Sequence, residues 1–293
     1  MRERSPFTRR ETDMTQPGMV AKVCLVTGTS SGIGHATALE LLHAGHFVYG
    51  AARRAGRMAA LRDAGGRPLP VDVTKEEDLK RAVDTVLDEH GRIDVLVNNA
   101  GAVVHGAVED TPLAMARDLF EVNVFAAARL AQLVLPPMRQ QGSGTIVNVS
   151  SIGGELAFPL GAWYYASKHA LEAFSDSLRM ETAQFGVHVV VIQPGIIKTD
   201  FEAGTARQLR EISGNGAYRQ MAEAMAGAAE TPAGHQSDQA TDPAVVGATI
   251  REAVESDRPE TRYAVGWQAE ALLQLNRSLP DREFDARITG SLS

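Results

Sequence analysis

The sequence predicts an α/β fold in which one doubly wound parallel sheet of about seven strands carries helices on both faces. From residue 20 onward, short β-branched apolar runs alternate with longer stretches whose apolar residues recur at helical spacing. Strands separated by helices require crossover connections, and these bury a parallel sheet on both faces. Apolar residues make up 44% and charged residues 22% of the chain, as is usual for globular proteins.

Each element follows from a local pattern. Seven apolar runs are predicted as strands, in the ranges 20–28, 46–53, 67–73, 93–101, 144–151, 187–195 and 261–266. The stretches between and after them are predicted as helices, at 33–44, about 55–64, 74–90, about 112–141, about 162–185, about 243–255 and about 267–277. Gly45 has the position of a C-terminal cap for the first helix, and Thr74 and Glu77 have the spacing of a capping box for the third.

Two segments interrupt this alternation. Residues 1–19 mix charges with prolines and show no apolar period, so we expect a flexible tail before a single domain over 20–293. Residues from about 200 to 241 are rich in alanine, glycine, glutamine and serine, with a weak helical pattern near 205–228. We expect this excursion to form a lid over a site.

Charge, cysteine content and hydropathy exclude several classes of protein. Twenty-nine basic against 36 acidic residues give a net charge of −7, which argues against nucleic acid as a partner. The single cysteine, Cys24, excludes an internal disulfide framework, and the eight histidines lack metal-ligand spacing, so we expect no metal site. No apolar run approaches the ~20 residues that span a bilayer, and the N-terminal segment lacks the apolar stretch of a secretory signal. We therefore expect a cytoplasmic protein without a membrane span.

A glycine-rich turn with the sequence TGTSSGIG occupies residues 27–34, between the first predicted strand and the first predicted helix. Glycines permit positive φ and let a diphosphate approach bare backbone, while the helix N-terminus offers unpaired N–H groups. The turn therefore predicts a dinucleotide site; the alternative is an ordinary strand–helix turn. The predicted phosphate-binding residues are Gly28, Ser30, Ser31, Gly32, Ile33 and Gly34.

The end of the second strand indicates which dinucleotide is bound. NAD sites usually place a carboxylate there for the ribose 2′-hydroxyl, whereas this chain has Arg53 and Arg54. Guanidinium groups fit a 2′-phosphate, so the sequence favours NADP(H) over NAD(H). Asp72 and Val73, at the end of the third strand, would border the adenine. The alternative for the arginines is a pair of solvated side chains.

Three residues suited to carbonyl–alcohol chemistry lie at the end of the fifth predicted strand and on the helix predicted after it. Tyr164 and Lys168 are four residues apart on a predicted helix and project from one face, and Ser151 lies at the end of the preceding strand. Tyr164 would donate a proton to a developing alkoxide, and Ser151 would hydrogen-bond the same oxygen. The ammonium of Lys168 would favour the phenolate form of the tyrosine. By itself, a Y-x-x-x-K string is usually an amphipathic helix surface.

Together these motifs make the chain resemble the short-chain dehydrogenases/reductases, a family with a Rossmann-like fold, over about residues 20–280. The family's TGxxxGxG matches residues 27–34, its NNAG matches 98–101 and its YxxxK begins at Tyr164. The catalytic asparagine of the family matches Asn123. Its catalytic serine matches Ser151 better than Ser150, because Ser151 lies 13 residues before the tyrosine.

The resemblance implies roles for further residues. Asn123 would support a helix kink and hold a water on a proton path from Lys168 to solvent, which is compatible with simply bracing the long helix. Lys168 would also bind the nicotinamide ribose, and Thr199 would contact the carboxamide. The residues that the resemblance assigns to the cofactor are Asn99, Ala100, Gly101, Tyr164, Lys168, Pro194, Gly195, Ile197 and Thr199.

The resemblance also implies an activity, the NADP(H)-dependent interconversion of a ketone or aldehyde and an alcohol by hydride transfer. The cofactor motifs are similar to those of hydroxysteroid- and retinol-type members, so a lipophilic steroid-, retinoid- or polyketide-like substrate is expected. Candidate cavity residues are Phe158, Trp163, Phe201, Tyr218, Met221 and Met225. The alternatives are a 3-ketoacyl-carrier-protein-type reductase and a non-catalytic NADP-binding regulator. Family members commonly form homodimers or homotetramers, and the same is expected here.

Overall fold

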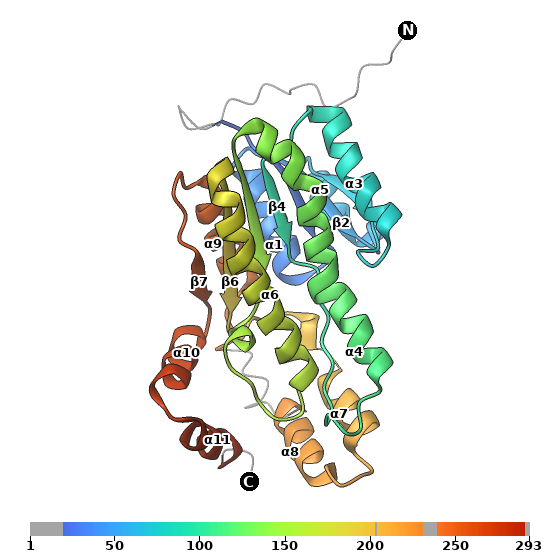
Figure 1. Ribbon diagram of the computed structural model, residues 1–293. Helices are drawn as coiled ribbons and strands as arrows, with labels where there is room; N and C mark the ends of the chain where they lie inside the picture. Colours follow the sequence, from blue (N-terminus) through green and yellow to red (C-terminus); the bar gives the residue numbers. More distant parts are fainter. Residues whose placement is uncertain (1–19, 203, 231–238, 291–293) are drawn as a thin grey trace.

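A parallel sheet of seven strands lies at the centre of the computed structural model, which describes residues 20–202, 204–230 and 239–290 (Figure 1). The strand order is β3-β2-β1-β4-β5-β6-β7, and each neighbouring pair is parallel. Strands are added outward from β1 in one direction and then from β4 in the other. This is the predicted doubly wound sheet, and its carboxyl ends share one edge.

The strands and helices follow the predicted alternation. The strands are β1 (Val23–Thr27), β2 (Phe47–Ala52), β3 (Arg67–Pro70), β4 (Val95–Asn98), β5 (Gly144–Val149), β6 (Val187–Pro194) and β7 (Arg262–Val265). The helices are α1 (Gly32–His43), α2 (Ala59–Asp63), α3 (Glu76–His90), α4 (Leu113–Phe120), α5 (Ala126–Gln141), α6 (Ala162–Thr182), α7 (Thr205–Ser213), α8 (Arg219–Glu230), α9 (Pro243–Glu255), α10 (Ala269–Ser278) and α11 (Asp281–Gly290).

Each face of the sheet has its own apolar core, because successive strand residues point to opposite faces. Val23 and Leu25 of β1 pack with residues of α3, α5 and α6, whereas Cys24 and Val26 pack with residues of α1, α2 and α9. All four β1 side chains are 3% exposed or less, as a strand buried on both faces requires. The near-continuous apolar runs in the sequence are therefore explained by two helix layers.

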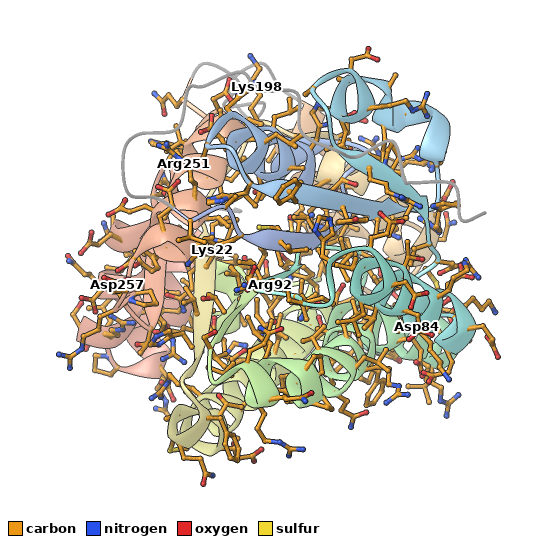
Figure 2. The ribbon with its side chains drawn as sticks, turned by 90° about the horizontal axis from the view of Figure 1, so that it is seen from above. Lys22, Asp84, Arg92, Lys198, Arg251 and Asp257 are labelled. Atoms are coloured by element: carbon orange, nitrogen blue, oxygen red, sulfur yellow. The ribbon has the colours of Figure 1, made fainter. Side chains whose placement is uncertain are left out.

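Figure 2 views the molecule onto the edge at which the strands begin. Lys22 and Arg92, which precede β1 and β4, lie near the centre of this view, between Asp84 of α3 and Asp257 beyond α9. The opposite edge, where the strands end, is flanked by α7 and α8 on one side and by α10 and α11 on the other (Figure 1). The predicted site residues lie toward this second edge.

One predicted helix cap is confirmed and the other is wrong. Gly45 follows α1 with a φ of +87°, and its N–H donates to the Leu42 carbonyl, as in a Schellman-type end. At α3 the N-cap is Lys75, one residue later than the predicted Thr74. The hydroxyl of Thr74 donates to the Asp72 carboxylate instead, because an acidic side chain two residues earlier competes for it.

The long predicted helix at 112–141 is divided by a π-helical segment, Glu121–Phe125, between α4 and α5. By length and composition this 29-residue helix could cross a membrane, with a mean hydropathy of 1.3 in its most apolar window. However, 44% of that window is buried in the protein, where α5 packs on α3, β4 and β5. The apolar residues are therefore those of a helix that covers a sheet.

The predicted lid contains α7 and α8, which correspond to the weak helical pattern near 205–228, with α8 ending two residues later at Glu230. The expected tail at 1–19 and the lid residues 231–238 lie outside the described residues. Beyond α10 the chain forms α11, which was not predicted because only two of its apolar residues, Phe284 and Ile288, recur at helical spacing. Phe284 is 6% exposed and packs with Ile152, Leu156 and Leu273, so the C-terminal helices cover the segment after β5.

This docking predicts a stability effect. We expect Phe284→Ala to lower the free energy of unfolding by about 3 kcal/mol, because it removes a buried aromatic ring and leaves a cavity. Urea unfolding followed by circular dichroism measures the change. Arg282→Ala, on the exposed side of the same helix, is the matched control. Equal stabilities of the two variants would contradict the packing of α11.

Candidate functional site

The glycine turn after β1 is shaped by steric necessity. Gly28 and Gly32 have φ values of +73° and +57°, a region that side chains rarely adopt. A Cβ on Gly34 would lie 2.6 Å from the Gly28 carbonyl oxygen and 2.2 Å from the Asn99 amide nitrogen, so no side chain fits there. The backbone at Gly34 therefore packs directly on the backbone at Gly28, which brings the N-terminus of α1 to the end of β1.

The first turn of α1 keeps its backbone donors uncapped. Its N-cap is Ser31, whose side chain makes no capping hydrogen bond and is exposed. A helix N-terminus with free N–H groups favours an anion. The methyl group of Thr199 lies close above Gly32, 3.1 Å from where a Cβ would be. The structure thus places Thr199, from the segment after β6, beside the predicted phosphate site.

A hydrogen-bonded junction joins the glycine turn to the NNAG segment. The Thr27 hydroxyl oxygen accepts from the backbone N–H groups of Asn99 and Ala100, at 3.0 and 2.9 Å. The Asn99 side-chain amide donates to the Thr27 carbonyl at 2.9 Å. The structure thereby brings together two of the predicted cofactor segments. Gly101 follows, near Asn123 and Phe201.

The predicted adenosine-side residues follow β2 and β3, which are adjacent strands. Arg53 and Arg54 are both exposed directly after β2, and in the described part of the chain neither makes an ion pair with a carboxylate. Asp72 is half-buried and accepts from the N–H and hydroxyl of Thr74. Val73 packs against the core beneath it.

Tyr164 and Lys168 lie on one face of α6, as predicted. The Lys168 ammonium lies 5.9 Å from the centroid of the Tyr164 ring and donates to the Val149 carbonyl at 2.9 Å. Lys168 is only 5% exposed, and burial lowers its pKa to about 8 from the ordinary 10.5. The nearby carboxylate of Glu172 acts in the opposite direction.

The two adjacent serines after β5 differ in their surroundings. Ser150 is 4% exposed, and its hydroxyl is buried with no hydrogen-bond partner among the described residues. Ser151 is half-buried, and its hydroxyl oxygen accepts from the Gly153 N–H at 3.0 Å. That contact leaves the hydroxyl proton of Ser151 free to be donated to a ligand. The geometry therefore favours Ser151, the serine that the sequence favoured.

Asn123 lies inside the π-helical segment and is 2% exposed. Its side-chain oxygen accepts from the Ala102 N–H, and its amide donates to the Ala102 carbonyl and to the Ser167 hydroxyl at 3.0 and 2.9 Å. Ser167 in turn donates to the Tyr164 carbonyl. Asn123 thus ties the NNAG segment to the tyrosine helix, and its place on a proton path stays a prediction.

The segment after β6 is held by a residue that the sequence did not single out. Gly195 allows close approach, since a Cβ there would lie 2.3 Å from the Trp267 carbonyl oxygen. Ile197 pairs with Thr241, whose carbonyl accepts from Lys198 and whose hydroxyl accepts from the Trp267 N–H. Thr241 closes the lid excursion onto the Pro-Gly segment. A lone threonine in a polar stretch carries no sequence signal for this role.

The predicted cavity residues separate into two groups. Phe201 lies beside Tyr164, with ring centroids 6.2 Å apart, and is 40% exposed. Phe158 packs on the neighbouring Tyr165, and Trp163 is half-buried on α6. Tyr218 and Met225, by contrast, pack within the lid against α7, and Met221 is exposed on α8. The first group adjoins the candidate site, whereas Tyr218 and Met225 pack within the predicted lid.

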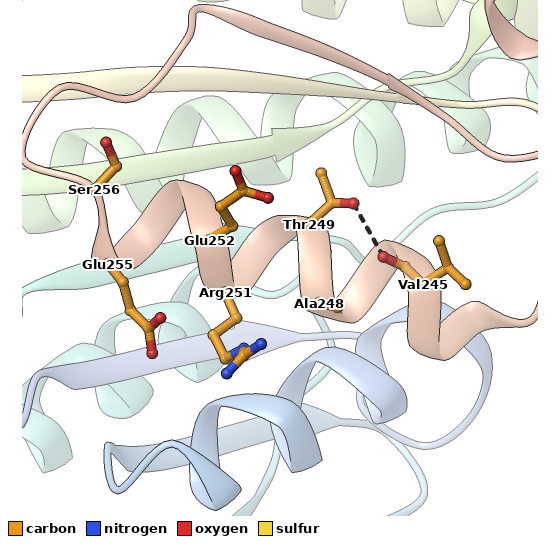
Figure 3. A pocket seen from close by; sticks show the side chains of 7 residues that line it. All are labelled: Val245, Ala248, Thr249, Arg251, Glu252, Glu255 and Ser256. Atoms are coloured by element: carbon orange, nitrogen blue, oxygen red, sulfur yellow. Dashed lines mark hydrogen bonds between the residues drawn. The ribbon is translucent and has the colours of Figure 1, made fainter. Parts of the chain in front are cut away.

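A surface depression of about 600 Å³ lies elsewhere, on α9 (Figure 3). Its lining residues all belong to α9 or follow it directly, namely Val245, Ala248, Thr249, Arg251, Glu252, Glu255 and Ser256. None of them is a predicted site residue, and the depression is open and shallow, so we assign it no catalytic role. Across the described ranges, no group of three or more His, Cys, Asp or Glu residues is arranged to hold a metal ion.

Comparison with known proteins identifies the family. Residues 22–210, well over half of the chain, match the short chain dehydrogenase family. The chain belongs to this family. A 3-ketodihydrosphingosine reductase of Bacteroides thetaiotaomicron is 37% identical over 67% of this chain and 71% of its own length. An uncharacterized oxidoreductase of Escherichia coli, YbbO, is 32% identical over 97% of this chain and its entire length.

Solved structures of short-chain dehydrogenases have the same architecture. One from Streptomyces avermitilis is 36% identical, with a TM-score of 0.75 over 93% of this chain and 96% of that one. A metagenomic short-chain oxidoreductase in complex with NADP is 26% identical, with a TM-score of 0.66 over 83% of this chain and 96% of its own. The Rossmann-like fold predicted from the sequence is thereby confirmed.

The buried Lys168 predicts a pH-dependent stability. Its folded-state pKa of about 8 lies below the ordinary 10.5, so between these values the unfolded chain binds a proton that the folded chain has lost. The wild type should therefore gain stability relative to Lys168→Met as the pH rises, by up to about 3 kcal/mol. Chemical denaturation at pH 7 to 10 measures the difference. Lys198→Met, which changes an exposed lysine, should show no such trend; a constant difference for Lys168→Met would contradict the burial effect.

Proposed function

We propose that this protein is an NADP(H)-dependent oxidoreductase that interconverts a ketone or aldehyde and a secondary or primary alcohol. The observation that carries the proposal is that Lys168 lies against the Tyr164 ring and donates to the Val149 carbonyl at the carboxyl end of β5, two residues before Ser151. The family is one of oxidoreductases, and this chain has every residue of its catalytic set. A non-catalytic dinucleotide-binding regulator would have no need of that complete set.

The residues around α1 fit a dinucleotide. Uncapped N–H groups at the helix N-terminus and the bare backbone at Gly28 and Gly32 would hold the diphosphate, with Ser30, Ser31 and Thr199 beside it. Arg53 and Arg54 would hold a 2′-phosphate, which supports NADP(H) over NAD(H). A structural relative with NADP bound supports the same class of cofactor. When bound, the nicotinamide supplies or accepts the hydride.

The protein's own groups handle the proton and the oxygen. The Tyr164 hydroxyl would donate its proton to the developing alkoxide, and the free hydroxyl proton of Ser151 would bond the same oxygen. The Lys168 ammonium, buried 5.9 Å from the tyrosine ring, favours loss of that proton because it stabilises the phenolate. Asn123 holds the tyrosine helix against the NNAG segment and so fixes the position of Tyr164 and Lys168 relative to that segment.

The substrate that the site supports is lipophilic. Phe201 lies partly exposed beside Tyr164, and Phe158 and Trp163 adjoin the same helix. One relative is named a 3-ketodihydrosphingosine reductase, which supports a ketone as the substrate. A carrier-protein substrate would call for a basic patch on the lid, but the cations there are scattered and two of them are paired, Arg207 with Glu211 and Arg210 with Glu223 and Glu230. We therefore favour a free hydrophobic ketone over an acyl-carrier conjugate, acted on by a cytoplasmic homo-oligomer.

The reaction is tested by turnover. We expect purified protein to oxidise NADPH with members of a panel of steroid, retinoid and long-chain ketones, followed at the nicotinamide absorbance. Tyr164→Phe should lower kcat/KM by about 10²–10⁴-fold because the proton donor is lost. The neighbouring Tyr165→Phe is the matched control and should retain activity. Absence of any carbonyl reduction, or full activity of Tyr164→Phe, would overturn the proposal.

The cofactor preference is tested separately. Arg53→Asp should raise the KM for NADPH by about ten- to a hundredfold, as the loss of a charge-assisted hydrogen bond to phosphate predicts, and leave NADH nearly unaffected. Arg62→Asp changes an equally exposed arginine on α2 and serves as the control. An unchanged ratio of NADPH to NADH efficiency in the Arg53 variant would exclude this arginine from 2′-phosphate recognition.

A further inference from the structure

The catalytic helix carries a row of ionisable groups that continues beyond the proposed active site. Tyr164, Lys168, Glu172 and Asp176 are spaced four residues apart on α6, so they lie one turn after another on a single face. Glu172 is 6% exposed, which is rare for a carboxylate. In this row the ammonium of Lys168 is followed, one and two turns later, by the carboxylates of Glu172 and Asp176.

Arg262 of β7 completes this row from the edge of the sheet. Its Nε donates to the Glu172 carboxylate at 3.0 Å, and its Nη2 donates to the Asp176 carboxylate at 2.8 Å. The strand β7 pairs with β6, and β6 packs on α6, so the arginine reaches the helix from the neighbouring strand (Figure 1). One guanidinium therefore bridges two successive turns of the catalytic helix.

A second contact links Glu172 to the loop that carries the catalytic serine. The side-chain amide of Gln193 donates to Glu172 at 3.1 Å and to Glu155 at 2.7 Å. Glu155 lies four residues after Ser151 and is paired with Arg277 of α10. Gln193 also directly precedes the Pro-Gly segment. Glu172 is thus the point at which the tyrosine helix, the serine loop and the end of β6 meet.

We propose that Glu172 and Arg262 are positioning residues that set the charge of the catalytic Lys168. The Glu172 carboxylate, one turn away in a buried setting, stabilises the protonated ammonium that the reaction requires. Arg262 opposes it, because its positive charge neutralises Glu172 and repels the lysine. The inference rests on the proposed function for its catalytic meaning, but the charge of Lys168 can be measured without turnover.

The surroundings of Lys168 support this assignment. Among the described residues its ammonium donates one hydrogen bond, to the uncharged Val149 carbonyl, and the nearby carboxylate of Glu172 raises the pKa of Lys168 against the effect of burial. The other carboxylates of the cluster are paired with arginines, Asp176 with Arg179 and Arg262, and Glu155 with Arg277. Coulombic effects are large in such buried settings. Neutralising Glu172 or Arg262 should therefore change the titration midpoint of Lys168 measurably.

The direct test is a lysine titration by NMR. The chain has only five lysines, at positions 22, 75, 80, 168 and 198, so [13Cε]-lysine labelling gives a readable spectrum, with Lys168→Met as the assignment. Glu172→Gln should lower the Lys168 midpoint by about 0.5–1 pH unit, since the favourable charge is lost. Arg262→Gln should raise it, since the opposing charge is lost. Opposite shifts from two neighbouring substitutions are not produced by general loosening of the fold.

Three further variants keep the test decisive. Arg179→Gln removes a cation that contacts Asp176 but not Glu172, and it should leave the Lys168 titration unchanged. Glu172→Asp and Arg262→Lys keep each charge and should restore titrations close to that of the wild type. With an active ketone, the alkaline limb of the kcat/KM profile for reduction should shift in the same direction as the NMR midpoint in each variant.

The outcomes separate this inference from the proposed function. The inference is overturned if the Lys168 midpoint is unchanged in Glu172→Gln, or if it changes in the same direction in Glu172→Gln and Arg262→Gln. Either result counts whether or not the enzyme reduces ketones. Opposite changes of the Lys168 midpoint in the two variants support the inference even if no tested ketone is reduced. The failure to reduce ketones would then count against the proposed function alone. If the variants are active but the alkaline limb of their kcat/KM profiles does not follow the changes in the Lys168 midpoint, the positioning role is overturned.

Discussion

The hydrogen bonds of Thr27 hold together the two strands between which the sheet reverses its winding. β1 and β4 are neighbours at the centre of the strand order, and the connections leave them toward opposite faces. The Thr27 hydroxyl oxygen accepts the N–H groups of Asn99 and Ala100, so the glycine turn and the NNAG segment are joined without a ligand. Parallel sheets bind ligands at such a reversal because the loops separate there. Here the side chain of Thr27 limits how far the loops after β1 and β4 separate.

The rest of the site is arranged around that junction at some cost in stability. Lys168 is almost fully buried, and its ammonium has one neutral oxygen as its hydrogen-bond partner among the described residues. Burial of a charged group is unfavourable, which is why its pKa falls to about 8. The π-helical segment at Asn123 is a further departure from regular geometry, and such segments often occur at functional sites. Lys168 ties α6 to the end of β5, and Asn123 ties it to the NNAG segment.

Much of the fold could be predicted because its causes are local. Strands buried on both faces are apolar throughout, and a turn that packs backbone on backbone, as at Gly34, admits only glycine. The failures arise where two local signals compete or where the signal is weak. Asp72 takes the hydroxyl that Thr74 was expected to use as a cap, and α11 has too few apolar residues to show helical periodicity. Ser151 could be preferred to Ser150 on spacing, but only burial distinguishes their hydroxyls physically.

The charged row on α6 shows where prediction from sequence ends. The four-residue spacing from Tyr164 to Asp176 is visible in the sequence, yet charged residues at helical spacing usually form a solvated surface. This row differs because residues far along the chain bury one of its carboxylates. Gln193 and Arg262 are 21 and 90 residues from Glu172, and they bury its carboxylate by giving it two donors. A buried carboxylate beside a buried ammonium interacts more strongly than the same pair in water. Tertiary structure, and not the helix itself, therefore turns this pattern into an electrostatic control of the lysine.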